Sequence, residues 1–69
     1  MGVAAVSWRA LPPGAPLRTG ARVRLTRLYS QVEGFYRGLT REGRCKVEPD
    51  EGPPPYQVLR TAIAEVWHG

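Results

Sequence analysis

The sequence of 69 residues contains no asparagine, one histidine, one cysteine and one phenylalanine, and no long apolar segment. A single cysteine excludes both an intramolecular disulfide and a metal site built from several cysteines. No run approaches the roughly 20 apolar residues that a membrane-spanning helix requires. The apolar stretch at residues 2–6 is too short for the core of a secretory signal, and no basic segment precedes it. We therefore expect a cytoplasmic protein that makes no contact with a membrane.

The side chains that usually form active sites are equally scarce. The only histidine, His68, lies next to the last residue, where chains usually fray, so no nucleophile has a fixed base beside it. Cys45 alternates with charged neighbours and is expected to be buried and unreactive. The adjacent carboxylates Asp50 and Glu51 lie in a proline-rich stretch that does not hold several oxygens rigidly around a metal. The sequence thus predicts a protein that is not an enzyme and that carries no metal and no cofactor.

Basic residues outnumber acidic ones by 10 to 6, which gives a net charge of +4. Nine of the ten basic residues are arginines, whose planar, forked donors match phosphate and carboxylate groups. The lack of asparagine and the scarcity of cysteine and methionine are also typical of thermophilic proteins. The excess of arginine therefore indicates either an anionic partner or a general compositional bias.

From residue 20 onward, apolar and polar residues alternate with the period of two that is typical of strands. Strands are expected at residues 22–26, 32–40, 44–48, 56–59 and 64–67. Glycines at 34 and 38 interrupt the second of these, as is common at bulges and bends. A proline-rich loop is expected at 49–55 and a short helical turn at 60–63. The residues expected to point into the core include Val23, Leu25, Cys45 and Val47.

Residues 1–19 differ from the rest, because three prolines occur between Pro12 and Pro16. We expect an N-terminal arm at 1–19, either frayed or laid across a small domain at 20–69, and the large aromatic Trp8 favours the docked arrangement. The predicted fold class is all-β: a small, closed or partly open barrel of about five strands, because closure removes exposed strand edges. Since so short a chain buries little surface, self-association is as well supported as a monomer.

The spacing of glycines and valines over residues 20–67 resembles that of small five-stranded barrels. The segments that carry this resemblance are Gly20–Leu25, Val32–Gly34, Gly38, Cys45–Glu48 and Ala62–Val66. Two groups are similar in this respect: the Sm-like RNA-binding proteins and the Src-homology-3-like (SH3-like) C-terminal module of biotin protein ligases. The resemblance implies an SH3-like or Sm-like barrel, and the first group implies RNA as a ligand.

Arginines on an outward strand face, near aromatic residues, indicate single-stranded nucleic acid as a partner. The phosphates would pair with the basic groups and the bases would stack on the rings. The expected nucleic-acid-binding residues are Arg22, Arg24, Tyr29, Tyr36, Arg37, Arg44 and Lys46. The alternative reading of the same residues is a solvated charged face with its aromatic side chains turned inward.

A second hypothesis is a protein-interaction or regulatory subunit. Aromatic residues contribute much of the binding energy of protein interfaces, and the candidates here are Trp8, Tyr56 and Trp67. The run of three prolines at 53–55 would form an extended polyproline segment that presents Tyr56 to a partner. A stiff loop before a strand explains the same prolines.

Overall fold

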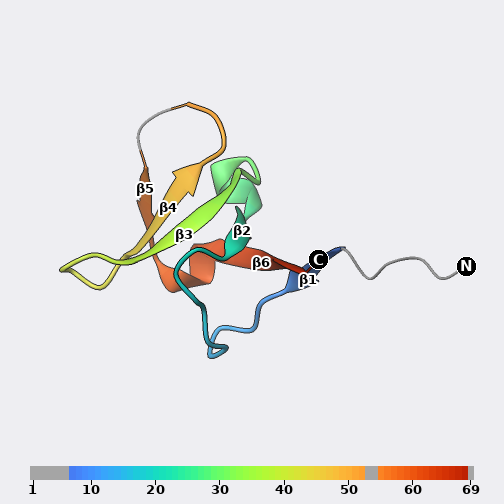
Figure 1. The fold of residues 1–69 in the computed structure, drawn as a ribbon, viewed down its shortest axis with the longest axis horizontal. Coiled ribbons are helices and arrows are strands. Elements are labelled where there is room, and N and C mark those ends of the chain that lie inside the picture. The colour runs from blue at the N-terminus through green and yellow to red at the C-terminus, as the bar shows by residue number, and fades with distance from the viewer. Residues whose placement is uncertain (1–6, 53–54, 69) are drawn as a thin grey trace, which may run out of the picture.

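The computed structural model describes residues 7–52 and 55–68 and contains one antiparallel sheet of six strands (Figure 1). The strands are β1 (Ser7–Ala10), β2 (Arg22–Leu25), β3 (Glu33–Leu39), β4 (Cys45–Pro49), β5 (Tyr56–Val58) and β6 (Ile63–His68). Two single 3₁₀ turns, η1 (Arg27–Tyr29) and η2 (Arg60–Ala62), precede β3 and β6. The all-β prediction is confirmed, as are the five strands expected from the alternating pattern. Two residues of the proline-rich loop, 53 and 54, lie outside the described residues.

The sheet has the order β1-β6-β2-β3-β4-β5 and is not closed, which corrects the expectation of a barrel of about five strands. Strands β2 to β5 follow one another as a meander, and β6 returns to pair with β2. Closing this set of five would require β5 to pair with β6. Instead β1, formed from the N-terminal arm, occupies that edge of β6 with Ser7 opposite His68 and Ala10 opposite Glu65. The arm thus supplies a sixth strand where closure would have occurred.

The core consists of the inward residues of β2 to β6. Val23 and Val47 are 0% exposed, and Leu25 and Cys45 are 1% exposed, so the predicted inward positions are confirmed. The remaining buried apolar residues of the described chain are Tyr36, Val58, Ala62 and Ile63. Burial of the strand residues follows from strand periodicity, which turns every second residue to the same face, whereas Ala62 is buried in the turn η2 directly before β6.

The segment between β1 and β2, residues 11–21, forms a loop that runs below β6 and β2 in Figure 1, and hydrogen bonds tie it to the sheet. The Leu11 amide donates to the Ala64 carbonyl at 3.0 Å, and the Gly20 amide donates to the Tyr36 carbonyl at 2.6 Å. Arg60 of η2 donates through Nη2 to two arm carbonyls, those of residues 12 and 15, at 3.1 and 3.0 Å. The described part of the expected arm is therefore laid against the domain, and residues 1–6 lie outside the described residues.

Between residues 7 and 68, apart from the two undescribed prolines, no helix has the length and apolar character needed to cross a bilayer. The same stretch contains no cluster of three or more histidine, cysteine or acidic side chains arranged to bind a metal ion.

Candidate nucleic-acid interface

The side of the sheet that faces away from the core, here called the outer face, gathers arginine, aromatic and acidic side chains. Strand register sets their arrangement, because residues paired across neighbouring strands point to the same side. Arg22 of β2 lies opposite Phe35 of β3, and Arg24 lies opposite Glu33. The charged and aromatic side chains of the outer face are Trp8, Arg22, Arg24, Glu33, Phe35, Arg37, Lys46, Glu48, Glu65 and Trp67.

One exposed aromatic ring on this face is Phe35, which is 36% exposed. The Arg22 guanidinium carbon lies 5.2 Å from the ring centroid and that of Arg37 lies 5.6 Å from it. Both distances are within the range of a cation–π contact. The phenyl ring is therefore held between two cations and keeps part of its surface open to solvent.

A second aromatic site lies at the β1 edge of the face, where β1 pairs with β6. The rings of Trp8 and Trp67 pack edge to face, with centroids 5.2 Å apart and planes inclined by 69°. The guanidinium carbon of Arg24 lies 4.5 Å from the Trp8 ring centroid. Trp8 is half-buried and Trp67 is 38% exposed, so the outer ring of the pair is open for stacking.

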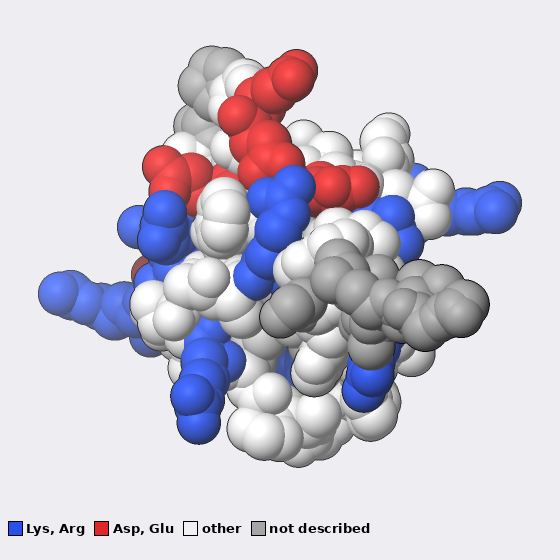
Figure 2. All heavy atoms as spheres, turned by 45° about the vertical axis from the view of Figure 1, so that its right-hand side comes forward, with Lys and Arg blue, Asp and Glu red and all other residues white. Residues whose placement is uncertain are grey.

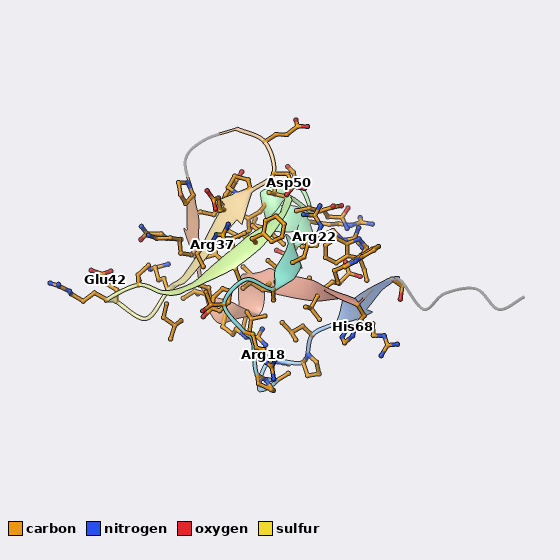
Figure 3. The ribbon with its side chains drawn as sticks, in the orientation of Figure 1. Arg18, Arg22, Arg37, Glu42, Asp50 and His68 are labelled. Carbon is orange, nitrogen blue, oxygen red and sulfur yellow. The ribbon has the colours of Figure 1, made fainter. Side chains whose placement is uncertain are left out.

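Ion pairs connect the two aromatic sites. Arg22 makes a forked contact with Asp50, with N–O distances of 2.9 and 2.6 Å, and Figure 3 shows the two side chains pointing toward each other. Glu33 lies between Arg22 and Arg24, at 3.2 and 3.6 Å. Arg24 also bonds Glu65 at 2.6 Å. The hydrogen bonds from Arg22 lower the pKa of the Asp50 carboxyl below its usual range.

A further pair, Arg37 with Glu48 at 2.8 Å, completes a network in which three arginines hold four carboxylates. The network carries one more negative than positive charge, and seven basic and two acidic side chains lie outside it, so the whole excess of positive charge comes from groups without an ion pair within the described ranges. Two members of this unpaired group are Lys46, which is exposed on the outer face, and Arg44, which is exposed beside it. Figure 2 shows carboxylates gathered in the upper part of one face, with basic side chains around the sides and below.

The structure places the basic residues expected to bind nucleic acid on one surface. Arg22, Arg24, Arg37 and Lys46 share the outer face, as alternation predicts, and Arg44 adjoins it. Sequence reasoning did not foresee that the first three arginines would be paired with carboxylates from β3, β4, β6 and the loop after β4. These partners are 9 to 41 residues away along the chain.

The two tyrosines of the predicted site are not on this surface. Tyr36 is 6% exposed and belongs to the core, where burial raises the pKa of its hydroxyl. Tyr29 is half-buried and packs edge to face against Tyr56, with ring centroids 6.0 Å apart. The ring that sequence reasoning missed is Phe35. Strict alternation from Glu33 along β3 marks it as outward and Tyr36 as inward.

The residues expected to bind a protein partner do not form one surface. Trp8 and Trp67 are in contact at the β1 edge, whereas Tyr56 lies in β5, the opposite edge strand of the sheet. The polyproline interpretation of residues 53–55 rests on two residues outside the described range.

Comparison with known proteins finds one informative similarity. The chain is 42% identical over 57 residues to a tyrosine recombinase XerC from Azotobacter vinelandii, a match that covers 71% of this chain and 19% of that protein. The chain thus spans about a fifth of the length of this relative. No family model matches the sequence. No solved structure matches it either.

This similarity contradicts the prediction that the chain is not an enzyme, because most of the chain matches part of a protein that is named as an enzyme. The prediction rested on the scarcity of catalytic side chains, which says nothing about a segment that serves a larger catalytic protein. The match covers 19% of the recombinase, and by itself it assigns no chemical role to any residue of this chain.

Proposed function

We propose that the chain binds single-stranded nucleic acid, RNA or DNA, across the outer face of its sheet. The observation that carries this proposal is a pair of exposed aromatic rings on one face. Phe35 lies between Arg22 and Arg37, and Trp67 packs against Trp8, the ring that Arg24 contacts. Aromatic rings on a sheet surface stack with bases of any sequence, because every base has a π face.

The unpaired cations supply the attraction for the phosphates. Lys46 is exposed on the outer face of β4, two residues before Glu48, and Arg44 is exposed just before β4; both lie outside the ion-pair network. The paired arginines add to the site when a phosphate takes the place of a carboxylate, since a guanidinium fork donates two parallel hydrogen bonds to either group in the same geometry. This exchange weakens binding relative to a face of free arginines, and we expect modest affinity with a strong dependence on salt.

The similarity to the recombinase supports the same class of ligand, because a recombinase acts on nucleic acid. We also propose that the sheet is related to SH3-like or Sm-like barrels. Its support is the meander of β2 to β5 with β6 returning beside β2, which is how a small five-stranded barrel begins to wrap.

Fluorescence anisotropy with labelled single-stranded RNA and DNA oligonucleotides at several salt concentrations tests the proposal. Stacking contributes roughly 1–3 kcal/mol per base, so Phe35→Ala and Trp67→Ala should each weaken binding by about 5- to 150-fold. The double variant R44A/K46A should lower the slope of log K against log salt by about 1.4, since each phosphate contact on a single strand contributes about 0.7.

The matched control is Leu28→Ala, which removes a side chain that is 84% exposed on η1, away from the outer face, and should leave affinity unchanged. No binding of either oligonucleotide at low salt would end the proposal. Equal losses in the Phe35, Trp67 and Leu28 variants would mean that the rings are not a stacking site.

A second candidate is a protein partner docked on the same outer face. The observation that favours it is the charge balance: three arginines and four carboxylates compensate one another around the exposed rings. Interfaces combine aromatic anchors with such a paired polar rim. Binding to a protein would lose affinity in the Trp67→Ala variant but would lack the steep salt dependence of phosphate contacts.

A further inference from the structure

A groove of about 430 Å³ lies on the side of β1 and β6 opposite the Trp8–Trp67 pair, between these strands and the residues that lead from β1 to β2. Its walls are mostly apolar and include Leu11, Leu17, Val66 and two prolines, Pro12 and Pro16. This volume lies within the range of roughly 300–1,000 Å³ that is typical of small-molecule sites. The groove shares no aromatic ring with the proposed nucleic-acid interface.

The polar side chains that line the groove are all basic. Arg9, Arg18 and His68 border it, and none of the described residues that line it carries a side-chain carboxylate. Figure 3 shows Arg18 and His68 on the same side of the sheet. Within residues 7–52 and 55–68, neither arginine takes part in an ion pair, in contrast to the neutralised arginines of the outer face.

Hydrogen bonds fix the wall of the groove at several points. Arg60 holds the carbonyls of Pro12 and Ala15, and the Ala15 amide closes a turn onto Pro12 at 3.0 Å. The Ala21 amide donates to the Arg18 carbonyl at 3.0 Å, which orders the far end of the wall. A preformed groove loses less conformational entropy on binding than a wall that must first order itself.

We propose that this groove binds an apolar monocarboxylate, namely a free medium-chain alkyl carboxylate. The alkyl chain would lie against the leucines, prolines and valine, and the carboxylate would accept hydrogen bonds from Arg9 and Arg18. This ligand matches both properties of the site: apolar walls and cations with no acidic or neutral hydrogen-bonding side chain among them.

Other anions fit this composition less well. A nucleobase carries several donors and acceptors that an apolar wall leaves without partners, and an unpaired polar group is costly to bury. A peptide that ends in an apolar residue presents a similar carboxylate but also brings backbone amides into the groove. An alkyl carboxylate has no polar group except the one that the cations bind.

Isothermal titration with hexanoate, octanoate and decanoate, combined with amide chemical-shift mapping, tests the proposal on the full chain. Each buried methylene contributes about 0.8 kcal/mol, so affinity should rise about 4-fold per methylene, or about 15-fold per two carbons, until the groove is filled. Shifts should concentrate on the groove residues, such as Leu17 and Val66. Octylamine should not bind, and octanol should bind more weakly than octanoate.

The variant Arg18→Gln should weaken octanoate binding several-fold, whereas Arg41→Gln removes the same charge from an exposed position outside the groove and should have no effect. Leu17→Ala removes part of the apolar wall, so the affinity should stop rising at a shorter alkyl chain than in the parent protein. Equal binding of octanoate and octylamine, equal effects of the two arginine variants, or tighter binding of an apolar C-terminal peptide would overturn the proposal. Because the oligonucleotide assay reads the opposite face, its result is independent of this one.

Discussion

The substitution Gly34→Ala tests whether the packing of β3 against β4 limits the stability of the sheet. Gly34 is buried and pairs with Pro49 across the two strands. A Cβ atom at this position would clash with the carbonyl oxygen of Glu48, and it would lie 2.8 Å from that carbonyl carbon and 2.9 Å from the Pro49 Cα. All three are backbone atoms, so no side-chain rotation relieves the contact and the two strands must separate locally.

Overpacking a well-packed site costs about 1–3 kcal/mol, and we expect the upper end here because backbone has to move. A chain of 69 residues has a free energy of unfolding of roughly 3–10 kcal/mol. A loss of about 3 kcal/mol should lower the melting temperature by about 12–24 °C, since each kcal/mol corresponds to about 4–8 °C in a domain of this size.

Thermal unfolding followed by far-UV circular dichroism measures this shift, and urea unfolding followed by tryptophan fluorescence gives the free energy. The control is Gly14→Ala, because a Cβ there meets nothing within 4 Å and the backbone does not need a positive φ. That variant should be neutral or more stable by up to about 1 kcal/mol, through the unfolded state. If Gly34→Ala melts within a few degrees of the parent protein, the close approach of the two strands is not a constraint and the reasoning fails.

Three other predictions concern single interactions. Arg22 lowers the folded-state pKa of Asp50, so their pair stabilises the fold above the unfolded-state pKa near 4 and loses this effect as the pH falls through the folded-state pKa. Asp50→Asn should therefore reduce the free energy of unfolding by less than about 1 kcal/mol at pH 7 and by nothing near pH 2. Urea unfolding at the two pH values measures this difference. Burial raises the pKa of Tyr36, so the free energy of unfolding should fall as the pH rises from the unfolded-state pKa near 10 toward the raised folded-state pKa. Tyr36→Phe should remove the part of this loss that comes from Tyr36, as urea unfolding at alkaline pH will show. Arg60→Ala should cost about 1–2 kcal/mol and speed hydrogen exchange at the Ala15 amide. Protection of the Val47 amide in the core should fall only by the amount that the global change in stability requires.

The alternating pattern was enough to predict the central strands. Val23, Leu25, Cys45 and Val47 are buried because each lies between polar neighbours at a spacing of two. The arm shows the limit of this reasoning. Ser7–Ala10 has no alternation that marks a strand, and it is one because the exposed edge of β6 offers backbone partners. That partner lies more than 50 residues away along the chain, so no local pattern reveals the pairing.

The candidate site was predictable in its basic residues but not in its electrostatics. Period two places Arg22, Arg24 and Arg37 on one face, as the structure shows. Their pairing with Glu33, Glu65 and other carboxylates depends on strand order and register, which a single sequence does not determine. Aromatic roles were partly misjudged, because two adjacent residues of one strand point to opposite sides and Tyr36, rather than Phe35, was taken as outward.

The antiparallel register of β1 with β6 has a consequence for how the module can be joined to other chains. Ser7 lies directly opposite His68, which places the entry and the exit of the described chain side by side, about 5 Å apart between Cα atoms as in any such pair. A host protein could therefore carry this sheet as an insertion within one surface loop, with both junctions at the same point and little distortion of the host backbone. Grafting it in this way requires no long linkers.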